Sequence, residues 1–129
     1  MRAVITISIV MLAGFSCVKK DLKVSNKKVY SLSAKKSLEY YNNSNSIFLD
    51  VRTEQEHETN HISGSILIPL EQIDSRANEL MRYEGKDIIV YCRSGRRSER
   101  ASTILRGYGF DVMNMEGGIL QWKGPITSE

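Results

Sequence analysis

The sequence predicts an α/β domain in which a central, mainly parallel sheet is flanked by helices on both faces. The 129-residue chain has the length of one domain, with 41% hydrophobic and 26% charged residues, as in globular proteins. From residue 29 to residue 125, short apolar runs alternate with amphipathic stretches, the pattern of interleaved strands and helices. The largely apolar run at 87–91 (DIIVY) is typical of a central parallel strand that is buried on both faces.

Along the first part of this region, residues 29–31 predict a short edge strand. Ser33 is a helix-capping residue, and Leu38 and Tyr41 share one face of the helix that follows. A run of Asn and Ser ends this helix. Residues 47–49 then predict a buried strand.

The middle of the chain predicts a short polar helix or turn at residues 54–60 and a short strand at 65–68. A longer helix is expected at 71–81, because apolar residues recur there at the three-to-four spacing of an inward helix face. These residues are Ile73, Ala77 and Leu80. Met81 is expected at a packing position.

The last part predicts an amphipathic helix at residues 98–108 and a strand at 112–113. Gly107 and Gly109 are expected to close the helix in left-handed conformations. The inward residues of the helix are Ala101, Ile104 and Leu105. Gly117 and Gly118 permit a tight turn, and Trp122, Met113 and Met115 are expected to fill core positions.

Composition restricts the partners and metals that the chain is expected to bind. The formal net charge is +3, with a pI near 8.9, which is far from the dense positive field of a dedicated nucleic-acid binder. We therefore expect no nucleic-acid partner. The two cysteines, Cys17 and Cys92, and the two histidines form no clustered Cys/His pair, so no metal site is expected.

The N-terminal segment predicts an export signal. After Met1 and Arg2 comes an apolar run that is too short to span a membrane, and small residues surround Cys17. This pattern resembles a bacterial lipoprotein signal, although Gly14 stands where a branched aliphatic residue is usual. The resemblance implies cleavage before Cys17, a lipid on that cysteine as the only membrane attachment, and a location in the periplasm or cell envelope.

Two alternatives stay open for this segment: secretion with cleavage nearby, or an uncleaved amphipathic or buried segment. The expected organisation is a signal peptide at 1–16, a polar, lysine-rich tether at 17–28, the folded domain at 29–125 and a tail at 126–129. If Cys17 carries a lipid, Cys92 is the free thiol of an exported protein.

The segment from Cys92 to Ser98 (CRSGRRS) carries the expected chemistry. It joins a buried strand to a helix N-terminus, where the helix dipole and unpaired amides favour thiolate over thiol. Gly95 lets successive amides converge on one point as an anion-binding nest. Nearby arginines can hold an anionic substrate and lower the pKa of Cys92 further. They are Arg93, Arg96, Arg97 and Arg100. We therefore expect nucleophilic attack by Cys92 on an anion.

Five motifs, in this order, resemble the rhodanese family of sulfurtransferases across roughly Val29 to Trp122. They are LDVR at 49–52, EHETNHISGSILIPL at 56–70, CRSGRR at 92–97, GYGF at 107–110 and GGILQW at 117–122. Asn60 stands where the family usually has glycine, and Ser65 where it usually has alanine. Since Asn tolerates the left-handed conformation, a small local adjustment is expected at residue 60.

The resemblance implies a reaction. Cys92 takes a sulfane sulfur from a small anionic donor such as thiosulfate, becomes a persulfide, and passes the sulfur to cyanide or a thiol. The loop amides of Arg93, Ser94, Gly95, Arg96 and Arg97 would cradle the outer sulfur. The persulfide is itself the intermediate, so no metal or organic cofactor is implied. A sulfur-relay partner protein can equally deliver the sulfur.

Two further readings of the same loop remain. Only four residues separate Cys92 from Arg97, one fewer than in cysteine phosphatases, so phosphatase or arsenate reductase activity is the less favoured enzymatic alternative. The domain can also act as a sulfide or redox sensor or as a docking module.

Three other polar residues are expected to support the site rather than react. Asp50 is expected to accept loop or helix amides, and Arg52 to pair with Glu56 or Glu58, although contact of Asp50 and Arg52 with substrate is an alternative. His61 is expected to be a hydrogen-bonding brace, because a thiolate whose pKa is already lowered needs no general base.

Overall fold

The computed structural model describes residues 30–128 and confirms the α/β prediction. Its main sheet has five strands, all parallel, in the order β1-β6-β5-β2-β4. In that order the strands are β1 (Tyr30–Ser33), β6 (Val112–Glu116), β5 (Asp87–Tyr91), β2 (Ser46–Asp50) and β4 (Ile66–Leu67). A second, antiparallel pair joins β3 (His61–Ile62) to β7 (Ile126–Thr127), so part of the expected tail forms a strand.

The middle strand, β5, is buried on both faces, as its sequence predicts. Ile88 and Val90 belong to one hydrophobic cluster, while Ile89 and Tyr91 belong to another. Because successive side chains of a strand point to opposite faces, the two clusters lie on opposite sides of the sheet. Each cluster needs a helical cover, which explains the layered arrangement.

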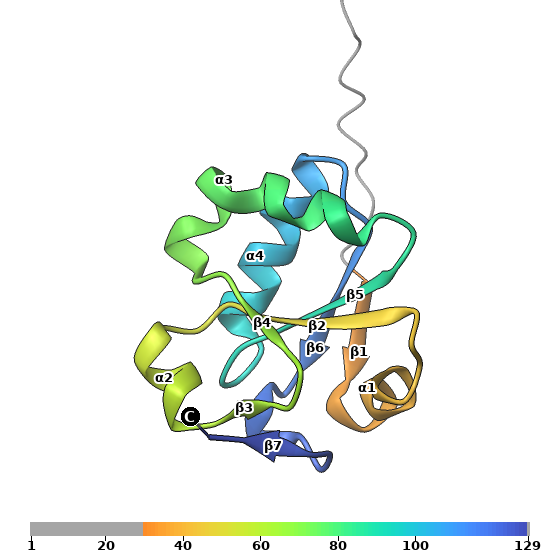
Figure 1. The fold of residues 1–129 in the computed structure, drawn as a ribbon, viewed down its shortest axis with the longest axis vertical. Helices are drawn as coiled ribbons and strands as arrows, with labels where there is room; N and C mark the ends of the chain where they lie inside the picture. The colour runs from red at the N-terminus through yellow and green to blue at the C-terminus, as the bar shows by residue number, and fades with distance from the viewer. Residues whose placement is uncertain (1–29, 129) are drawn as a thin grey trace, which may run out of the picture.

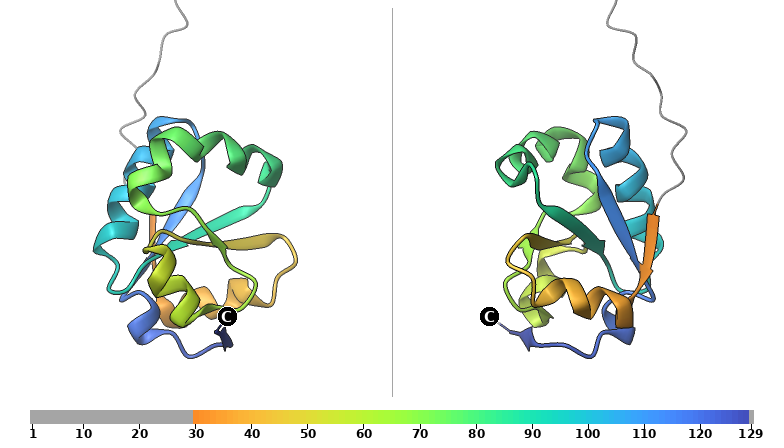
Figure 2. Two further views of the ribbon diagram at one scale, coloured as in Figure 1. Left: turned by 60° about the vertical axis from the view of Figure 1, so that its left-hand side comes forward. Right: turned by 90° about the vertical axis from the view of Figure 1, so that its right-hand side faces the viewer.

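The helices supply that cover on both sides (Figures 1 and 2). The α-helices are α1 (Ala34–Tyr41), α2 (Glu54–Thr59), α3 (Ile73–Arg76) and α4 (Arg96–Gly107), and the 3₁₀ segments are η1 (Leu70–Gln72), η2 (Ala77–Tyr83) and η3 (Ile119–Gln121). Residues of α3 and α4 pack into the cluster that contains Val90, and residues of α1 into the one that contains Ile89.

Helix α1 begins as its capping residue predicts. The Ser33 hydroxyl accepts a hydrogen bond from the backbone N–H of Lys36 at 3.1 Å, which satisfies one of the free amides of the first turn. Leu38 and Tyr41 both pack against the hydrophobic cluster on this side of the sheet.

The single helix expected at residues 71–81 is wrong, because the segment is divided into η1, α3 and η2. The predicted inward face is nevertheless confirmed, because Ile73, Ala77 and Leu80 are buried. Ser75 donates its hydroxyl to the carbonyl of Gln72, and such side-chain bonds compete with regular helix bonds. Met81 is 64% exposed, so its expected packing position is also wrong.

Helix α4 begins at Arg96, two residues earlier than expected. Its end depends on one glycine rather than two. Gly109 has φ = +93°, whereas Gly107 is the last helical residue and has no positive φ, so the expectation for Gly107 is wrong. One left-handed residue suffices because the amides of Gly109 and Phe110 then reach back to the carbonyls of Arg106 and Leu105.

The C-terminal turn and core plug are as predicted. Gly117 and Gly118 have φ values of +80° and +58°, which glycine adopts without the steric cost of a side chain. Trp122 is buried, with ring-centroid distances of 5.6 Å to Tyr41 and 5.3 Å to Phe48. Met115 is fully buried and Met113 packs against the same cluster.

The expected signal peptide at 1–16, the lipid-modified Cys17 and the tether at 17–28 lie outside the described residues and stay predictions. Within residues 30–128, no helix combines the length and the apolar character that crossing a bilayer requires.

Candidate active site

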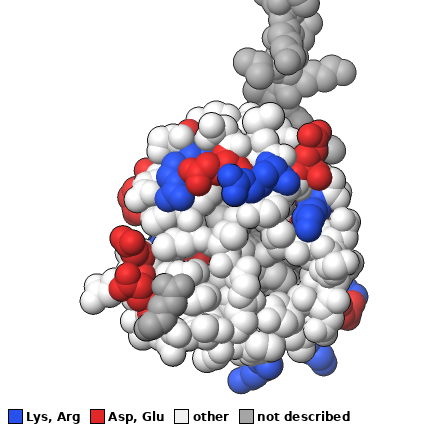
Figure 3. Space-filling model, viewed as in Figure 1, with Lys and Arg blue, Asp and Glu red and all other residues white. Residues whose placement is uncertain are grey.

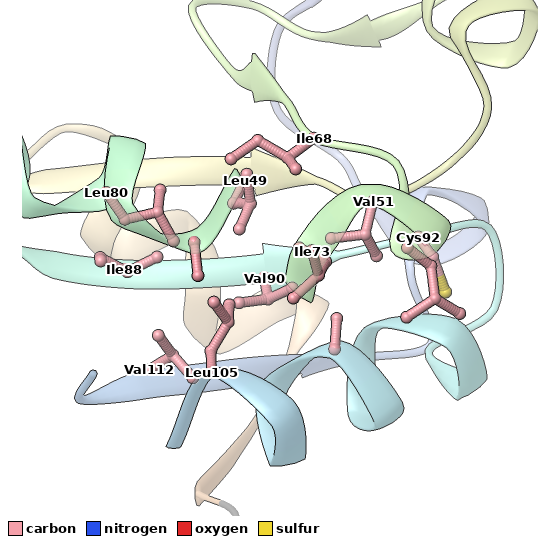
Figure 4. Close-up of a cluster of buried hydrophobic side chains, with 13 residues drawn as sticks. Leu49, Val51, Ile68, Ile73, Leu80, Ile88, Val90, Cys92, Leu105 and Val112 are labelled. Atoms are coloured by element: carbon pink, nitrogen blue, oxygen red, sulfur yellow. The ribbon is translucent and has the colours of Figure 1, made fainter. Parts of the chain in front are cut away.

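Cys92 lies at the end of the core, immediately after β5, where Figure 4 shows it at one end of the buried cluster. The residue is only 1% exposed. Gly95 turns the chain with φ = +101° and is the N-cap of α4, and its backbone N–H donates to Cys92 Sγ at 3.1 Å. The N-terminus of α4 therefore faces the sulfur, as the sequence predicts.

The thiolate form of Cys92 is stabilised by hydrogen bonds. Burial raises the pKa of Cys92, but the Ser98 hydroxyl and the backbone amides of Ser98, Gly95 and Ser94 together outweigh burial, so that the pKa lies below its usual value. The sequence also predicts a contribution from the arginines. In the structure the pKa is lowered chiefly by the loop and by the first turn of α4, a setting in which cysteine pKa values are commonly lowered.

Ser98 belongs to the candidate site, although its role is not predicted from the sequence. It is fully buried, and its hydroxyl lies 3.5 Å from Cys92 Sγ and 3.1 Å from the carbonyl oxygen of Gly95. A hydroxyl has one proton, so it donates to only one of these acceptors at a time. The available signal was a small polar residue in the first turn of the helix that follows the cysteine.

Replacing Ser98 with alanine is expected to slow the alkylation of Cys92 by iodoacetamide roughly tenfold at pH values below the thiol's pKa, because a hydrogen bond to a charged group contributes about 1.5 kcal/mol. The pH profile should move to higher pH, since the thiolate is destabilised relative to the thiol. The measurement is the second-order alkylation rate between mildly acidic and alkaline pH.

Ser102 provides the matched control for this variant. It lies one turn further along α4, is equally buried, and its hydroxyl has no hydrogen-bond partner among the described residues. Ser102→Ala should leave the pH profile unchanged. An identical shift in both variants would show that Ser98 acts only through helix packing.

The turn after β6 supports the reactive loop from behind. The amide of Ile119 donates to the carbonyl of Cys92 at 2.9 Å, and the amide of Leu120 donates to that of Arg93 at 3.3 Å. A Cβ atom added to Gly118 would lie 2.3 Å from the carbonyl oxygen of Arg93. The sequence predicts a turn at Gly117 and Gly118, but the close approach of Gly118 to the loop is visible only in the tertiary structure.

The arginines of the loop divide into two groups. Arg97 is committed to an ion pair, with its guanidinium 2.7 and 2.8 Å from the two carboxylate oxygens of Glu56. Arg93, Arg96 and Arg100 are exposed and, within residues 30–128, form no ion pair. Among the described residues, the unpaired positive charge of this segment therefore lies at the surface, on Arg93, Arg96 and Arg100.

The pairing expected for Arg52 is wrong. Arg52 pairs with Asp50, from Nη2 to Oδ2 at 2.7 Å, and also donates to the carbonyl of Asn60 at 2.6 Å. Asp50 and Arg52 are both buried, so the Asp50 carboxylate is close enough to pair with Arg52 inside the core. The Glu56 carboxylate instead pairs with Arg97. Asp50 does accept a backbone amide, that of Arg52, as expected.

A wider buried network surrounds this pair. Asp50 also accepts hydrogen bonds from His57 Nδ1 at 2.9 Å and from the Tyr91 hydroxyl at 3.0 Å. Because Tyr91 donates its proton to Asp50, the hydroxyl of Ser65 must donate to Tyr91 across their 2.9 Å contact. Ser65 is thus part of the network that holds Tyr91, the residue before Cys92.

His61 is a brace, as predicted. Its Nδ1 donates to the carbonyl of His57 at 2.8 Å, and the two imidazole rings are stacked 3.8 Å apart. Asn60, between them in sequence, has φ = −164°, which is extended rather than left-handed. The expected left-handed adjustment at Asn60 is therefore wrong, since the extended chain already brings its carbonyl to Arg52.

Within residues 30–128, no three side chains of His, Cys, Asp and Glu are grouped so as to hold a metal ion. The group in the site that can react is the buried Cys92 sulfur, which receives hydrogen bonds from backbone amides and from the Ser98 hydroxyl. Such an arrangement can stabilise a thiolate nucleophile.

Comparison with known proteins gives a family and several relatives. The sequence model described as "Rhodanese-like domain" matches residues 33–125. The "Putative sulfur carrier protein YrkF" of Bacillus subtilis is 44% identical over 77 residues, which are 59% of this chain and 40% of that protein. The tRNA uridine(34) hydroxylase of Cronobacter sakazakii is 33% identical over 81 residues, which are 59% of this chain and 23% of that enzyme.

Solved structures show the same fold. A rhodanese-related protein from Thermoplasma volcanium superimposes with a TM-score of 0.70 and 30% sequence identity, covering 78% of this chain and 99% of that one. The chain spans less than half the length of each of the two curated relatives above, so their names describe proteins with additional parts.

Proposed function

Because this chain belongs to the rhodanese-like domain family, we propose that it is a sulfurtransferase that carries a sulfane sulfur on Cys92. The observation that carries the proposal is the environment of the sulfur: it is held at the end of β5 and receives hydrogen bonds from Gly95 and Ser98. These bonds favour the thiolate, which is the reactive form of cysteine.

In the first step, the Cys92 thiolate attacks the outer sulfur of thiosulfate. A new S–S bond forms to Cys92, the S–S bond of thiosulfate breaks, and sulfite leaves with the bonding electron pair. The product is a Cys92 persulfide. The amides of Ser94, Gly95 and Ser98, which lower the pKa of Cys92, are also suited to stabilise the negative charge of the persulfide.

In the second step, an acceptor nucleophile attacks the outer sulfur of the persulfide. Cyanide yields thiocyanate, and a thiolate yields a new persulfide on the acceptor. The Cys92–sulfur bond breaks and Cys92 leaves as a thiolate, which the same hydrogen bonds make a good leaving group. The chain's own residues suffice for both steps, because the sulfur is bound covalently.

Two exposed arginines of this segment favour a negatively charged sulfur donor. Arg93 and Arg96 are exposed beside the loop, and their guanidinium groups can attract an anion toward Cys92. A relay partner protein is an equally suitable source or recipient of sulfur, and the likeness to a protein named as a sulfur carrier supports that route. We propose the small anion as donor and a thiol or cyanide as acceptor. Export and a lipid anchor on Cys17 stay predictions.

Incubation of the domain with thiosulfate is expected to add one sulfur atom to the intact mass, and the adduct should be absent in Cys92→Ser. Addition of cyanide should then remove the extra sulfur and release thiocyanate continuously in the presence of both substrates. The Cys92→Ser variant should lose this turnover completely, because a hydroxyl at this position cannot replace the thiolate.

Each result of this experiment distinguishes one function from another. An adduct without turnover would favour a sulfide or redox sensor, and the absence of any adduct from thiosulfate or from an organic persulfide would overturn the sulfurtransferase proposal. Cys92-dependent hydrolysis of p-nitrophenyl phosphate would instead favour the phosphatase alternative.

A further inference from the structure

The ion pair between Glu56 and Arg97 connects α2 to the first turn of α4. Both nitrogens of the guanidinium end contact the carboxylate, Nη1 to Oε2 at 2.7 Å and Nη2 to Oε1 at 2.8 Å. This two-bond geometry is the one that an anionic substrate would otherwise use. The side chains are 32% and 30% exposed, so the pair lies within reach of a dissolved anion.

Arg97 lies in the first turn of α4, the helix that begins at the loop around the Cys92 sulfur. It is five residues after Cys92, in the same helix turn as Ser98, whose hydroxyl contacts Sγ. The hydrogen bonds and charge of Glu56 raise the pKa of Arg97 most, and the charges of Cys92 and Asp50 contribute in the same direction. An anion that approaches Cys92 therefore meets Arg97 already paired.

Glu56 is held in this position independently of Arg97. Its carboxylate accepts hydrogen bonds from the backbone N–H of Thr53 at 2.9 Å and from the Thr53 hydroxyl at 3.1 Å, while the Glu56 amide donates back to that hydroxyl. Bonds to Arg97 and Thr53 hold the pKa of Glu56 at about 2, although burial opposes this. The carboxylate is thus charged at any pH suitable for an assay.

We propose that Glu56 determines the charge selectivity of the site, because its carboxylate occupies Arg97 and disfavours doubly charged sulfur donors relative to singly charged ones. The inference rests on the proposed sulfurtransferase function and deepens it. A dianion must compete with Glu56 for Arg97 and is also repelled by the carboxylate, whereas a monoanion or an uncharged persulfide experiences about half of this repulsion or none. Arg93 and Arg96, which are unpaired in the described part of the chain, serve donors of either kind.

The test compares two donors of similar size, thiosulfate with two negative charges and methanethiosulfonate with one. In Glu56→Gln, the amide oxygen can still accept from Thr53, and glutamine suits this position of a capping box, so α2 should keep its N-terminus. The KM for thiosulfate should fall roughly tenfold and that for methanethiosulfonate at most about threefold, with kcat for both nearly unchanged.

A second variant assigns the change to Arg97. In Glu56→Gln/Arg97→Gln, the gain for thiosulfate should disappear, because the guanidinium that lost its charged partner through the first substitution is then missing. Retention of the gain in the double variant would overturn the proposed role of Arg97. Equal changes for both donors, or none, would overturn the inference as a whole.

The chain offers a matched control on another surface. Arg76 and Glu79 form a similar two-bond pair, at 2.7 and 3.1 Å, in α3 and η2, where Figure 3 shows charged side chains gathered over these elements. Glu79→Gln should change neither KM. If the unmodified domain forms no persulfide with any donor, the sulfurtransferase proposal fails; if it forms one and Glu56→Gln leaves the ratio of KM values unchanged, only the inference fails.

Discussion

Replacing Asp50 with alanine is expected to lower the free energy of unfolding by about 3–5 kcal/mol, because removing one partner of a buried ion pair leaves the other charge uncompensated. Arg52 would retain its charge in a site where it is only 4% exposed. His57 and Tyr91 would each lose their hydrogen bond to the carboxylate. For a domain of ordinary stability this loss is a large part of the total.

Urea unfolding followed by circular dichroism measures the effect. Asp111→Ala is the control, since the Asp111 carboxylate is 90% exposed and lies 3.5 Å from its arginine partner, Arg106. That variant should unfold within about 0.5 kcal/mol of the parent. A comparable loss in the two variants, or a loss below about 1 kcal/mol for Asp50→Ala, would contradict the role given to the buried network.

Replacing Gly118 with alanine is expected to displace the Cys92 loop and to reduce sulfur transfer strongly, roughly a hundredfold, because small displacements of reacting groups have effects of this size. The new Cβ would lie 2.3 Å from the carbonyl oxygen of Arg93 and 2.5 Å from that of Cys92. Both contacts are with backbone atoms, so the loop itself must shift. The measurements are the persulfide yield and the alkylation rate of Cys92.

Gly85→Ala separates this close contact from backbone strain. Gly85 has φ = +83°, so alanine is strained there as well, but its Cβ would have no atom within 4 Å. This variant should lose some stability and keep the reactivity of Cys92. If Gly85→Ala and Gly118→Ala reduce the alkylation rate equally, the loss must come from general destabilisation rather than from contact with the loop.

Asp50→Ala and Gly118→Ala remove different supports of the same strand end, the C-terminal end of β5. Tyr91 is held from one side by Asp50, Ser65 and the backbone of Ile62. The next residue, Cys92, is held from the other side, because its carbonyl accepts a hydrogen bond from the backbone N–H of Ile119. The position of the sulfur therefore depends on two supports that the sequence predicts only separately, Asp50 as an acceptor of backbone amides and Gly117-Gly118 as a turn.

Much of the fold and of the candidate site was predictable because the signals are local. The apolar run of β5, the Ser33 cap and the glycine that turns the chain after Cys92 each act within a few residues. The position of a cysteine between a buried strand and a helix N-terminus is likewise a property of consecutive residues. Helix 71–81 was less predictable because a local competitor, the Ser75 hydroxyl, acts against the periodicity.

The partners of charged and buried polar groups were decided only by the tertiary structure. Four carboxylates lie within six residues of Arg52 in sequence, and choosing Asp50 over the three glutamates required knowing which of them is buried with it. Glu56 instead pairs with Arg97, forty-one residues away in sequence. The strength of an ion pair depends on the distance between the two charges and on how far they are removed from water, and both depend on how the elements pack. By itself the sequence therefore predicted the candidate nucleophile and the strand that carries it, while packing determined which arginines of the same segment remain unpaired in the described part of the chain.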